Sequence, residues 1–299
     1  MTNEKAMRLR TLLGDYPNTR ALKQGELKSA GIEFDFAGVK IPNTAFKRVV
    51  RDLEFDVAEL AIMTYLMAKA AGKPLVLVPA VIAARFQHSF LVYDAARGPL
   101  LPGDLAGRRV GIRSSSVTTV AWIRGILASD YGVDLDRVRW VTFEDAHVAE
   151  YVDPPNTERA AAGKDMFTML RDGELDAIVS GTPGTGDHLL QAMIADPAAA
   201  AEDWHRRNRA IQINHMVVVK DSLSRDHPGA VAEVFRLLEE SKRAAGLPAA
   251  SAIDMYPFGV EANRRNLGVA IDYAFRQRLI PRRFEVDELF DDVTRVLGR

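Results

Sequence analysis

Strand-like and helix-like segments alternate along this chain, and this alternation limits its fold more than any other feature. The apolar runs "MRLRTLLG", "GIEFDFAGV" and "FDVAEL" are followed in turn by "NTRALKQGEL", "NTAFKRVVRDL" and "MTYLMAKAAG". Further along, "RRVGIRS" precedes "SVTTVAWIRGILASDYG", in which apolar residues recur at helical spacing. This order is typical of α/β proteins, in which helices flank a mainly parallel sheet.

One helix-to-strand unit occurs twice. "RDLEFDVAEL" begins at Arg51 and "RDGELDAIVSG" begins at Arg171, and both follow the pattern Arg-Asp-x-Glu-apolar-Asp-apolar. Each copy lies between the end of an expected helix and a buried strand. A unit repeated in the same context indicates two lobes built alike. The alternative is that helix-end chemistry alone repeats so short a pattern.

Two apolar runs each begin with a histidine: His88 opens "HSFLVY" and His215 opens "HMVVV". If the first run leaves one lobe and the second returns to it, residues 89–214 form lobe 2, while residues 1–88 and 215–299 form a discontinuous lobe 1. The two crossing strands, side by side, then make a hinge. Strands from both lobes point their carboxyl ends at a shared cleft, where α/β proteins bind ligands. We expect both histidines at the floor of this cleft.

The composition is that of an ordinary globular protein. The 299 residues are 47% hydrophobic and carry a formal net charge of −1, and no dense Lys/Arg run suggests nucleic-acid binding. The absence of cysteine excludes disulfides, a thiol nucleophile and Cys-ligated zinc. The N-terminal stretch "MTNEKAMRLRTLLGDY" lacks the long apolar core of a secretory signal, and the longest apolar runs are too short or too interrupted to span a bilayer. We therefore expect a cytoplasmic protein that does not associate with membranes.

Several motifs together resemble one enzyme family. They are "GDYPNTRAL", "FDVAELAIMTYLMAKAAGKP", "RFQHSFLVY", "RRVGIRSSSVTTVAWIRGILASDYGVD", "INHMVVVK", "YPFGVEANRRNL" and "LIPRRFEVDELF". Spread over nearly the whole chain, they are similar to the 4,5-dihydroxyphthalate decarboxylase family, which has the type II periplasmic-binding-protein fold. The chain departs from the family pattern at Gln87, where the family tends to have arginine, and at Ala61 and Ile62, where it has more serine. These departures leave the substrate open.

The resemblance implies a cofactor-independent, non-oxidative decarboxylase of a hydroxylated aromatic carboxylate, most like the conversion of 4,5-dihydroxyphthalate to protocatechuate. Such a reaction needs one group that takes a phenolic proton and another that delivers a proton to carbon. His88 and His215 are the candidates, with Glu59 from "FDVAEL" as an acid of the cleft. The alternatives are that the histidines are packed core residues and that Glu59 forms a structural pair with Arg85.

A turn rich in hydroxyl groups is the candidate carboxylate site. "GIRSSSVTT" lies where a strand turns into a helix, and free backbone N–H groups at such a turn bind anions. The alternative is that one serine caps the helix and the others are solvated. A second turn, "SGTPGTGDH", follows the repeated strand. The candidate substrate-binding residues are Arg85, Arg113, Ser114, Ser115, Ser116, Thr118 and Thr182.

No cofactor is expected, and the partner should be a small aromatic carboxylate. A divalent metal held by His88, His215 and Glu59 is an alternative, because a catechol chelates metals, but no local ligand spacing supports it. The same fold also serves binding proteins, so the alternative function is a substrate-binding protein of an ABC-type transporter or sensor for an aromatic or organic acid. A fold relative of the menaquinone-pathway enzymes or the thiamine-pyrimidine synthases would act on another substrate. A homo-oligomer is left open.

Overall fold

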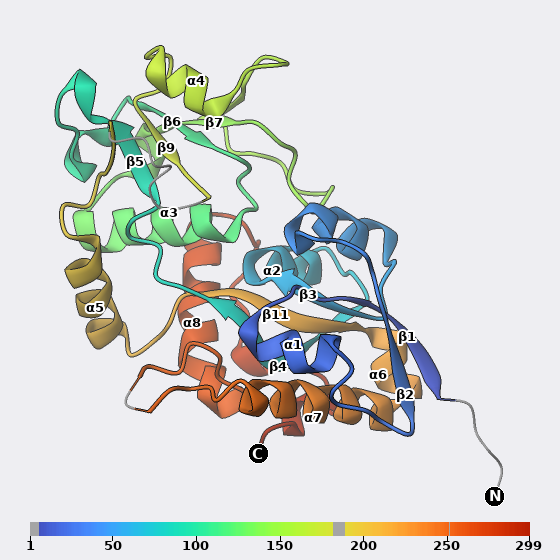
Figure 1. Ribbon diagram of the computed structural model, residues 1–299. Coiled ribbons are helices and arrows are strands. Elements are labelled where there is room, and N and C mark those ends of the chain that lie inside the picture. The colour runs from blue at the N-terminus through green and yellow to red at the C-terminus, as the bar shows by residue number, and fades with distance from the viewer. Residues whose placement is uncertain (1–5, 182–188, 251) are drawn as a thin grey trace, which may run out of the picture.

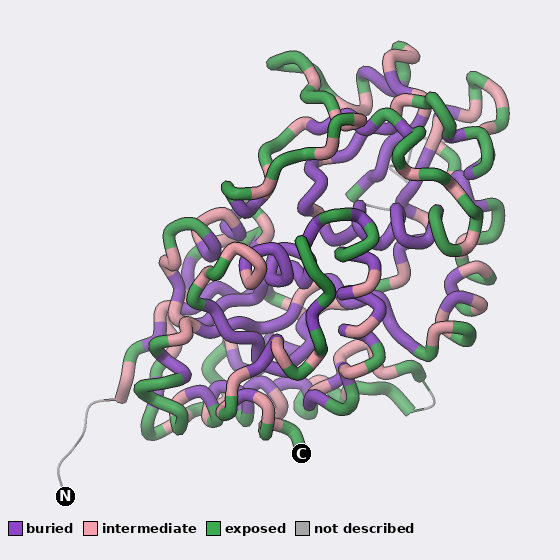
Figure 2. Tube along the Cα trace, turned by 180° about the vertical axis from the view of Figure 1, so that it is seen from behind, coloured by how far each residue is buried: buried purple, intermediate pink, exposed green. Residues whose placement is uncertain are grey.

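Two lobes, each with its own β-sheet, make up the protein. The computed structural model describes residues 6–181, 189–250 and 252–299. Lobe 2 lies above lobe 1 in Figure 1, and the C-terminus lies on lobe 1. Buried residues follow the strands and the inward faces of the helices in both lobes (Figure 2). The α/β class predicted from the alternating segments and the two lobes predicted from the repeated unit are therefore confirmed.

The sheet of lobe 1 has the strand order β2-β1-β3-β11-β4. The first three of these strands are parallel, whereas β11 is antiparallel to both of its neighbours. The sheet is thus mixed rather than mainly parallel, because a strand that returns from the other lobe is inserted beside the parallel set. The bounds are β1 Met7–Leu12, β2 Ile32–Phe36, β3 Val57–Ala61, β4 Leu75–Ala84 and β11 Ile213–Lys220.

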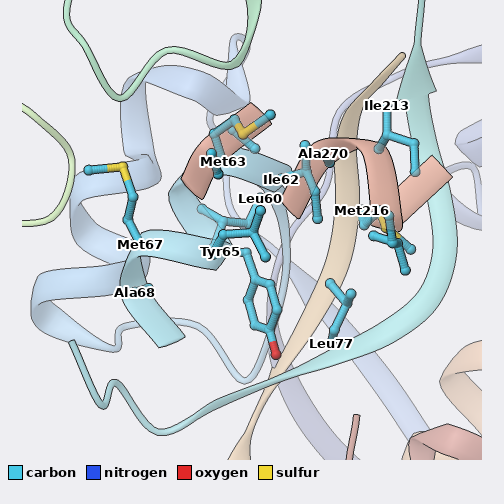
Figure 3. Packing of buried hydrophobic residues seen from close by; sticks show 14 of the residues in the cluster. Leu60, Ile62, Met63, Tyr65, Met67, Ala68, Leu77, Ile213, Met216 and Ala270 are labelled. Atoms are coloured by element: carbon cyan, nitrogen blue, oxygen red, sulfur yellow. The ribbon is translucent and has the colours of Figure 1, made fainter. Parts of the chain in front are cut away.

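Helices cover both faces of this sheet, and the alternation of side chains along β11 shows how. Met216 and Val218 belong to the same hydrophobic cluster as residues of α2 and α8, whereas Val217 and Val219 belong to a second cluster with residues of α7. Figure 3 shows the first cluster, in which Met216 lies near Ala270 of α8. The bounds are α1 Pro17–Lys23, α2 Ile62–Ala70, α6 Asp221–Asp226, α7 Pro228–Ala244 and α8 Val260–Arg276.

The expected helix in "NTAFKRVVRDL" is not a single α-helix. The structure has a 3₁₀-helix at Pro42–Ala45 and a π-helical turn at Arg48–Asp52, which ends at Leu53 in the left-handed region (φ 49°). Two further 3₁₀-helices, Val286–Leu289 and Thr294–Val296, lie near the C-terminus. Within the described residues, no helix combines the length and the apolar character needed to cross a membrane.

The sheet of lobe 2 has the order β10-β5-β9-β6-β7-β8. β9, β6, β7 and β8 are parallel, and β5 is antiparallel to β9 and to β10. The strand bounds are β5 Leu91–Asp94, β6 Arg109–Ile112, β7 Arg139–Thr142, β8 Thr157–Arg159, β9 Ala177–Val179 and β10 Leu190–Ala192. The helices are α3 Thr118–Tyr131, α4 Met166–Arg171 and α5 Pro197–Asn208, with 3₁₀-helices at Ala95–Arg97, Pro102–Leu105 and Leu135–Arg137.

The repeated sequence unit forms the same structure in both lobes. β3 lies between the parallel β1 and the antiparallel β11, and β9 lies in the same way between β6 and β5. Just before these strands, Asp56 Oδ2 accepts a hydrogen bond from Arg10 N at 2.9 Å, and Asp176 Oδ2 accepts one from Arg109 N at 2.9 Å. The aspartate of the pattern therefore fastens each central strand to its parallel neighbour.

The two segments that connect the lobes are hydrogen-bonded to each other. The chain leaves the sheet of lobe 1 after β4 and returns to it at β11. Gln87 N donates to Gln212 Oε1 at 2.7 Å, and Gln87 Nε2 donates to Asn214 Oδ1 at 2.9 Å. All three side chains are buried. The amide network fixes the position of one connection relative to the other.

A shared hydrophobic core also joins the lobes through α3. Trp122 is fully buried in the cluster that includes α2 and α8, and its ring lies edge-on to Tyr273 at 5.5 Å. Its Nε1 donates to Ile213 O at 2.8 Å, and Gln277 Nε2 donates to Ala121 O at 2.8 Å. One side of the lobe junction is therefore packed.

The repeated aspartates generate a stability prediction. Asp56→Asn and Asp176→Asn should each lower the free energy of unfolding by about 1–3 kcal/mol, because each removes a charged acceptor of a backbone hydrogen bond. Both also lose an ion pair, with Lys220 at 2.8 Å and with Arg108 at 3.1 Å. Urea unfolding followed by circular dichroism measures the change. Losses no larger than that of the exposed control Asp52→Asn would contradict this role.

Candidate active site

A cavity of about 600 Å³ lies between the lobes. Lobe 1 contributes the ends of β3, β4 and β11, and lobe 2 contributes the start of α3 and the loops after β7 and β9. Phe46, Phe143 and Met166 give it apolar surface, while Arg85 and Arg113 bring positive charge. A cavity of this size and lining suits a small ligand with an apolar ring and negative groups.

The carboxylate of Glu59, which is 0% exposed, lies beside the cavity in contact with two residues that line it, Tyr16 and His215. Its Oε1 accepts a hydrogen bond from Tyr16 OH at 2.8 Å and lies 2.8 Å from His215 Nδ1. Its Oε2 accepts one from Gly14 N at 2.5 Å. In the antiparallel pair of β3 and β11, Glu59 is opposite Val217, so His215 lies diagonally across on the same face. Strand register thus brings the histidine to the carboxylate.

This arrangement orients the imidazole of His215. The ring lines the cavity and its side chain is 19% exposed, while Nδ1 is held by Glu59. Burial and the negative charge of Glu59 raise the pKa of Tyr16, so its phenol keeps its proton and donates it to the carboxylate. Nε2 of His215 is then the nitrogen available to a ligand. A carboxylate behind the ring also stabilises the imidazolium that forms when Nε2 takes up a proton.

Gly14 and Tyr16 are site residues that the sequence analysis did not select, although both lie in the motif "GDYPNTRAL". A Cβ atom on Gly14 would lie 2.4 Å from Cζ of Tyr16, so no larger residue fits without moving that ring. The glycine therefore allows its backbone N–H and the neighbouring phenol to reach the same carboxylate. The family motif was the signal that could have identified them.

His147 is a second histidine of the cavity that the sequence analysis did not select. It lies in the loop "FEDAHVAEY" after β7 and is 3% exposed. Its Nδ1 lies 2.7 Å from Thr64 Oγ1. The Phe46 ring separates it from His215, with edge-on centroid distances of 5.7 Å to His147 and 5.1 Å to His215. No motif or strand-end position marks this residue in the sequence.

His88 does not reach the cavity. It is 1% exposed, and neither ring nitrogen has a hydrogen-bond partner among the described residues. The ring lies edge-on to Trp204 of α5 at 6.5 Å, and burial lowers its pKa to about 4. The side chain of Gln87 points into the amide network between the two connections. The next side chain, His88, points instead toward Trp204 in the packed core. The structure thus brings His215 and His147 to the cavity, and not His215 and His88.

Arg85 lines the cavity. The alternative in which it forms a structural pair with Glu59 is wrong, because the two side chains are not in contact. Its guanidinium stacks on Phe90 at 4.1 Å, and Nη2 donates to Gly181 O at 3.2 Å. Burial lowers its pKa, although an arginine in a protein keeps its charge. No carboxylate forms an ion pair with Arg85 within the part of the chain that the structure describes. Its charge is therefore available to an anionic ligand.

The serine turn has a different role from the one expected. Ser114, Ser115 and Ser116 are buried and do not line the cavity. The hydroxyls of Ser114 and Ser116 are 3.0 Å apart, and Ser116 Oγ also accepts a hydrogen bond from His147 N at 3.0 Å. Ser116 therefore holds the backbone of His147, and the three buried serines do not offer their side chains to the cavity.

Two other members of the predicted carboxylate site do line the cavity. Arg113 lies there with Glu144 at 3.8 Å, and Thr118 Oγ1 accepts a hydrogen bond from Met63 N at 3.3 Å. Arg113 therefore has its charge partly balanced by a nearby acid, in contrast to Arg85. Another predicted binding residue, Thr182, lies outside the described residues.

Two helices begin at the cavity. The N-cap residues of α2 and α3, Ala61 and Val117, both line it, and neither provides a side-chain cap. The first N–H groups of a helix lack partners within the helix, and the helix dipole places positive potential at that end. Together with Arg85, these two N-termini favour a negatively charged ligand.

The residues that could have formed a metal site are not brought together. Glu59 and His215 are in contact, but His88 lies against Trp204. Among the described residues, no group of three or more histidine, aspartate and glutamate side chains is placed to hold a metal ion.

Comparison with known proteins identifies relatives at modest identity. No family model matches the chain. A protein from Comamonas testosteroni named 4,5-dihydroxyphthalate decarboxylase is 28% identical over 257 residues, which cover 80% of this chain and 76% of the relative. A protein of the same name from Pseudomonas putida is 29% identical over 212 residues, which cover 67% of this chain and 82% of the relative.

Solved structures with the same fold include two sulfonate-binding proteins. The alkanesulfonate-binding protein SsuA from Xanthomonas axonopodis pv. citri matches with a TM-score of 0.60 over 96% of this chain and 99% of that protein. The periplasmic aliphatic sulphonate binding protein SsuA from Escherichia coli matches with a TM-score of 0.62 over 96% and 98%. Each is 14% identical to this chain, so the likeness concerns the fold alone.

The burial of His88 generates a prediction about acid stability. Its pKa is about 4 in the folded protein, below the 6.5 of a solvated histidine, so between these pH values the unfolded chain binds a proton that the folded chain does not. Stability therefore falls as the pH decreases from 6.5 to about 4, with a slope of up to about 1.4 kcal/mol per pH unit from this residue. His88→Leu should remove that part of the slope.

Urea unfolding at a series of pH values tests the prediction. The exposed His227→Leu serves as the control, because its ring is already solvated in the folded protein. An unchanged slope in His88→Leu would show that His88 does not couple folding to protonation.

Proposed function

We propose, from the premise that this chain belongs to the 4,5-dihydroxyphthalate decarboxylase family, that it removes CO2 from a hydroxylated aromatic carboxylate. The observation that carries the proposal is the buried contact between Glu59 and His215 at the edge of the cavity. A histidine oriented in this way can transfer a proton. The name of these relatives makes 4,5-dihydroxyphthalate the first substrate to test.

The cavity offers separate surfaces to the two parts of such a substrate. Phe46, Phe143 and Met166 can contact an aromatic ring. Arg85 and the N-termini of α2 and α3 can hold a carboxylate with charge-assisted hydrogen bonds. With one carboxylate held there, the ring is placed with its reacting carbon at a fixed distance from His215.

In the proposed reaction, protonated His215 delivers a proton from Nε2 to the ring carbon that bears the leaving carboxylate. The bond between this carbon and the carboxylate then breaks, and its electron pair restores the aromatic ring as CO2 leaves. One proton is consumed, and solvent supplies it again to His215, so the step balances without an oxidant or reductant. Glu59 holds the imidazole in place and stabilises its charged form.

A binding protein is the second candidate, favoured by the similarity of the fold to the SsuA proteins. Arg85 and the two helix N-termini would be sufficient for it, because both attract anions without any chemistry. The buried Glu59 behind His215 supports the enzyme instead, since binding alone does not require an oriented proton-transfer group. Turnover separates the two candidates.

Replacing His215 should slow the decarboxylation step without weakening substrate binding. His215→Gln should lower kcat by a factor of about 10² to 10⁴, the usual contribution of acid–base catalysis, while the Kd for 4,5-dihydroxyphthalate changes little. Glu59→Gln should cause a smaller loss, because it leaves the imidazole in the cavity. The two replacements together should cost less than the product of the single losses. A wild-type kcat in His215→Gln would contradict the assignment.

Arg85 and Arg113 should differ in how much they contribute to substrate binding. Arg85→Gln should raise the KM for 4,5-dihydroxyphthalate by about 10- to 150-fold, because it removes a charge-assisted bond worth about 1.5–3 kcal/mol. Arg113→Gln is the matched control and should cost less, since Glu144 partly balances that charge. Steady-state kinetics with the dicarboxylate and with a monocarboxylate analogue provide the test. Equal losses in both variants would place the carboxylate elsewhere.

A further inference from the structure

His147 belongs to lobe 2 but is fixed to lobe 1. Its carbonyl accepts a hydrogen bond from Arg51 Nε at 2.8 Å, and the preceding carbonyl, of Ala146, accepts one from Arg51 Nη2 at 2.6 Å. Its ring contacts Thr64 of α2, again from lobe 1. From its own lobe, Ser116 Oγ accepts the backbone N–H of His147. His147 is therefore held from both lobes, its backbone by Arg51 and Ser116 and its ring by Thr64, at the wall of the cavity that the lobes share.

The protonation state of this imidazole is set by its surroundings. Burial lowers the pKa of His147 to about 3, and the nearby charges of Arg113, Lys47, Arg51 and His215 lower it as well. The ring is therefore neutral at any pH near neutrality. Its Nδ1 contacts Thr64 Oγ1, and Nε2 has no hydrogen-bond partner among the described residues. A neutral ring that lines the cavity and has one nitrogen without a partner among the described residues can receive a proton from a ligand.

We propose that His147 is a second catalytic residue, whose Nε2 accepts the proton of the substrate hydroxyl para to the leaving carboxylate and later returns it. Its Nδ1–H donates to Thr64 Oγ1 in this state, which leaves Nε2 as the acceptor. The inference rests on the proposed decarboxylase function and gives His147 a role distinct from that of His215.

The chemistry of the intermediate explains why a weak base is sufficient. When His215 protonates the ring carbon, the para hydroxyl becomes the O–H of a protonated ketone, which is strongly acidic. His147 takes this proton. The bond to CO2 then breaks, its electrons restore the ring as a phenolate, and His147 gives the proton back to the oxygen. A base with a pKa of about 3 is unprotonated before the reaction and returns the proton readily to a phenolate.

A substrate whose hydroxyl is already ionised should no longer need this base. We would measure kcat for wild type, His147→Gln and His215→Gln with 4,5-dihydroxyphthalate and with a ring-fluorinated analogue that has a more acidic hydroxyl, over a range of pH. With the parent substrate, His147→Gln should lower kcat by about 10²-fold or more. The loss should become smaller with the fluorinated analogue and at higher pH, whereas the loss in His215→Gln should not.

Two further variants complete the experiment. Thr64→Val removes the acceptor of Nδ1–H without removing the imidazole, so it should show a smaller loss with the same dependence on hydroxyl acidity. It also replaces His147→Gln as the test if that variant does not fold. His227→Gln, exposed and outside the cavity, should leave kcat unchanged. A loss in His147→Gln or Thr64→Val that is the same for both substrates and at every pH, or no loss, would overturn the inference. Lack of CO2 release by the wild type would instead overturn the proposed function.

Discussion

A buried carboxylate is the interaction on which the site depends. Removing the charge of Glu59 from water is unfavourable unless hydrogen bonds and a counter-charge compensate, so its environment must be built around it. The protein supplies a backbone N–H from Gly14, a phenol from Tyr16 and the imidazole of His215. These groups come from the loop after β1 and from β11. Satisfying one charge therefore fixes the loop, two strands of the sheet and the orientation of the histidine.

The two lobes then bring different components to this fixed point. Lobe 1 provides the pair of Glu59 and His215, and lobe 2 provides the start of α3 and the loop that carries His147. The packed core around Trp122 closes one side of the junction, and the amides of Gln87 and Gln212 join the connections. As a result, the open side presents two helix N-termini and the guanidinium of Arg85 toward one cavity, which is an environment for anions.

The fold could be predicted from the sequence because its signals are local and repeated. Alternating segments indicated the α/β class, and the aspartate of the repeated unit has the same hydrogen bond at Asp56 and Asp176. Glu59 and His215 were selected as single residues, but their contact depends on strand register, and the alternative pairing of Glu59 with Arg85 is not formed. The sequence pattern selected His88, which is buried away from the cavity, and did not select His147, which lines it. Which one reaches the cavity depends on how Gln87 and the loop after β7 are packed, and these are tertiary contacts.

The central claim is that a protein of this fold uses an oriented histidine to protonate an aromatic carbon and release CO2. The most direct measurement is to incubate the purified protein with 4,5-dihydroxyphthalate in D₂O, quantify CO2 and examine the aromatic product by NMR. We predict CO2 and protocatechuate in equal amounts, with one deuterium at the carbon that lost the carboxylate. Saturable binding of 4,5-dihydroxyphthalate with no CO2 would contradict the claim, and would favour a binding protein.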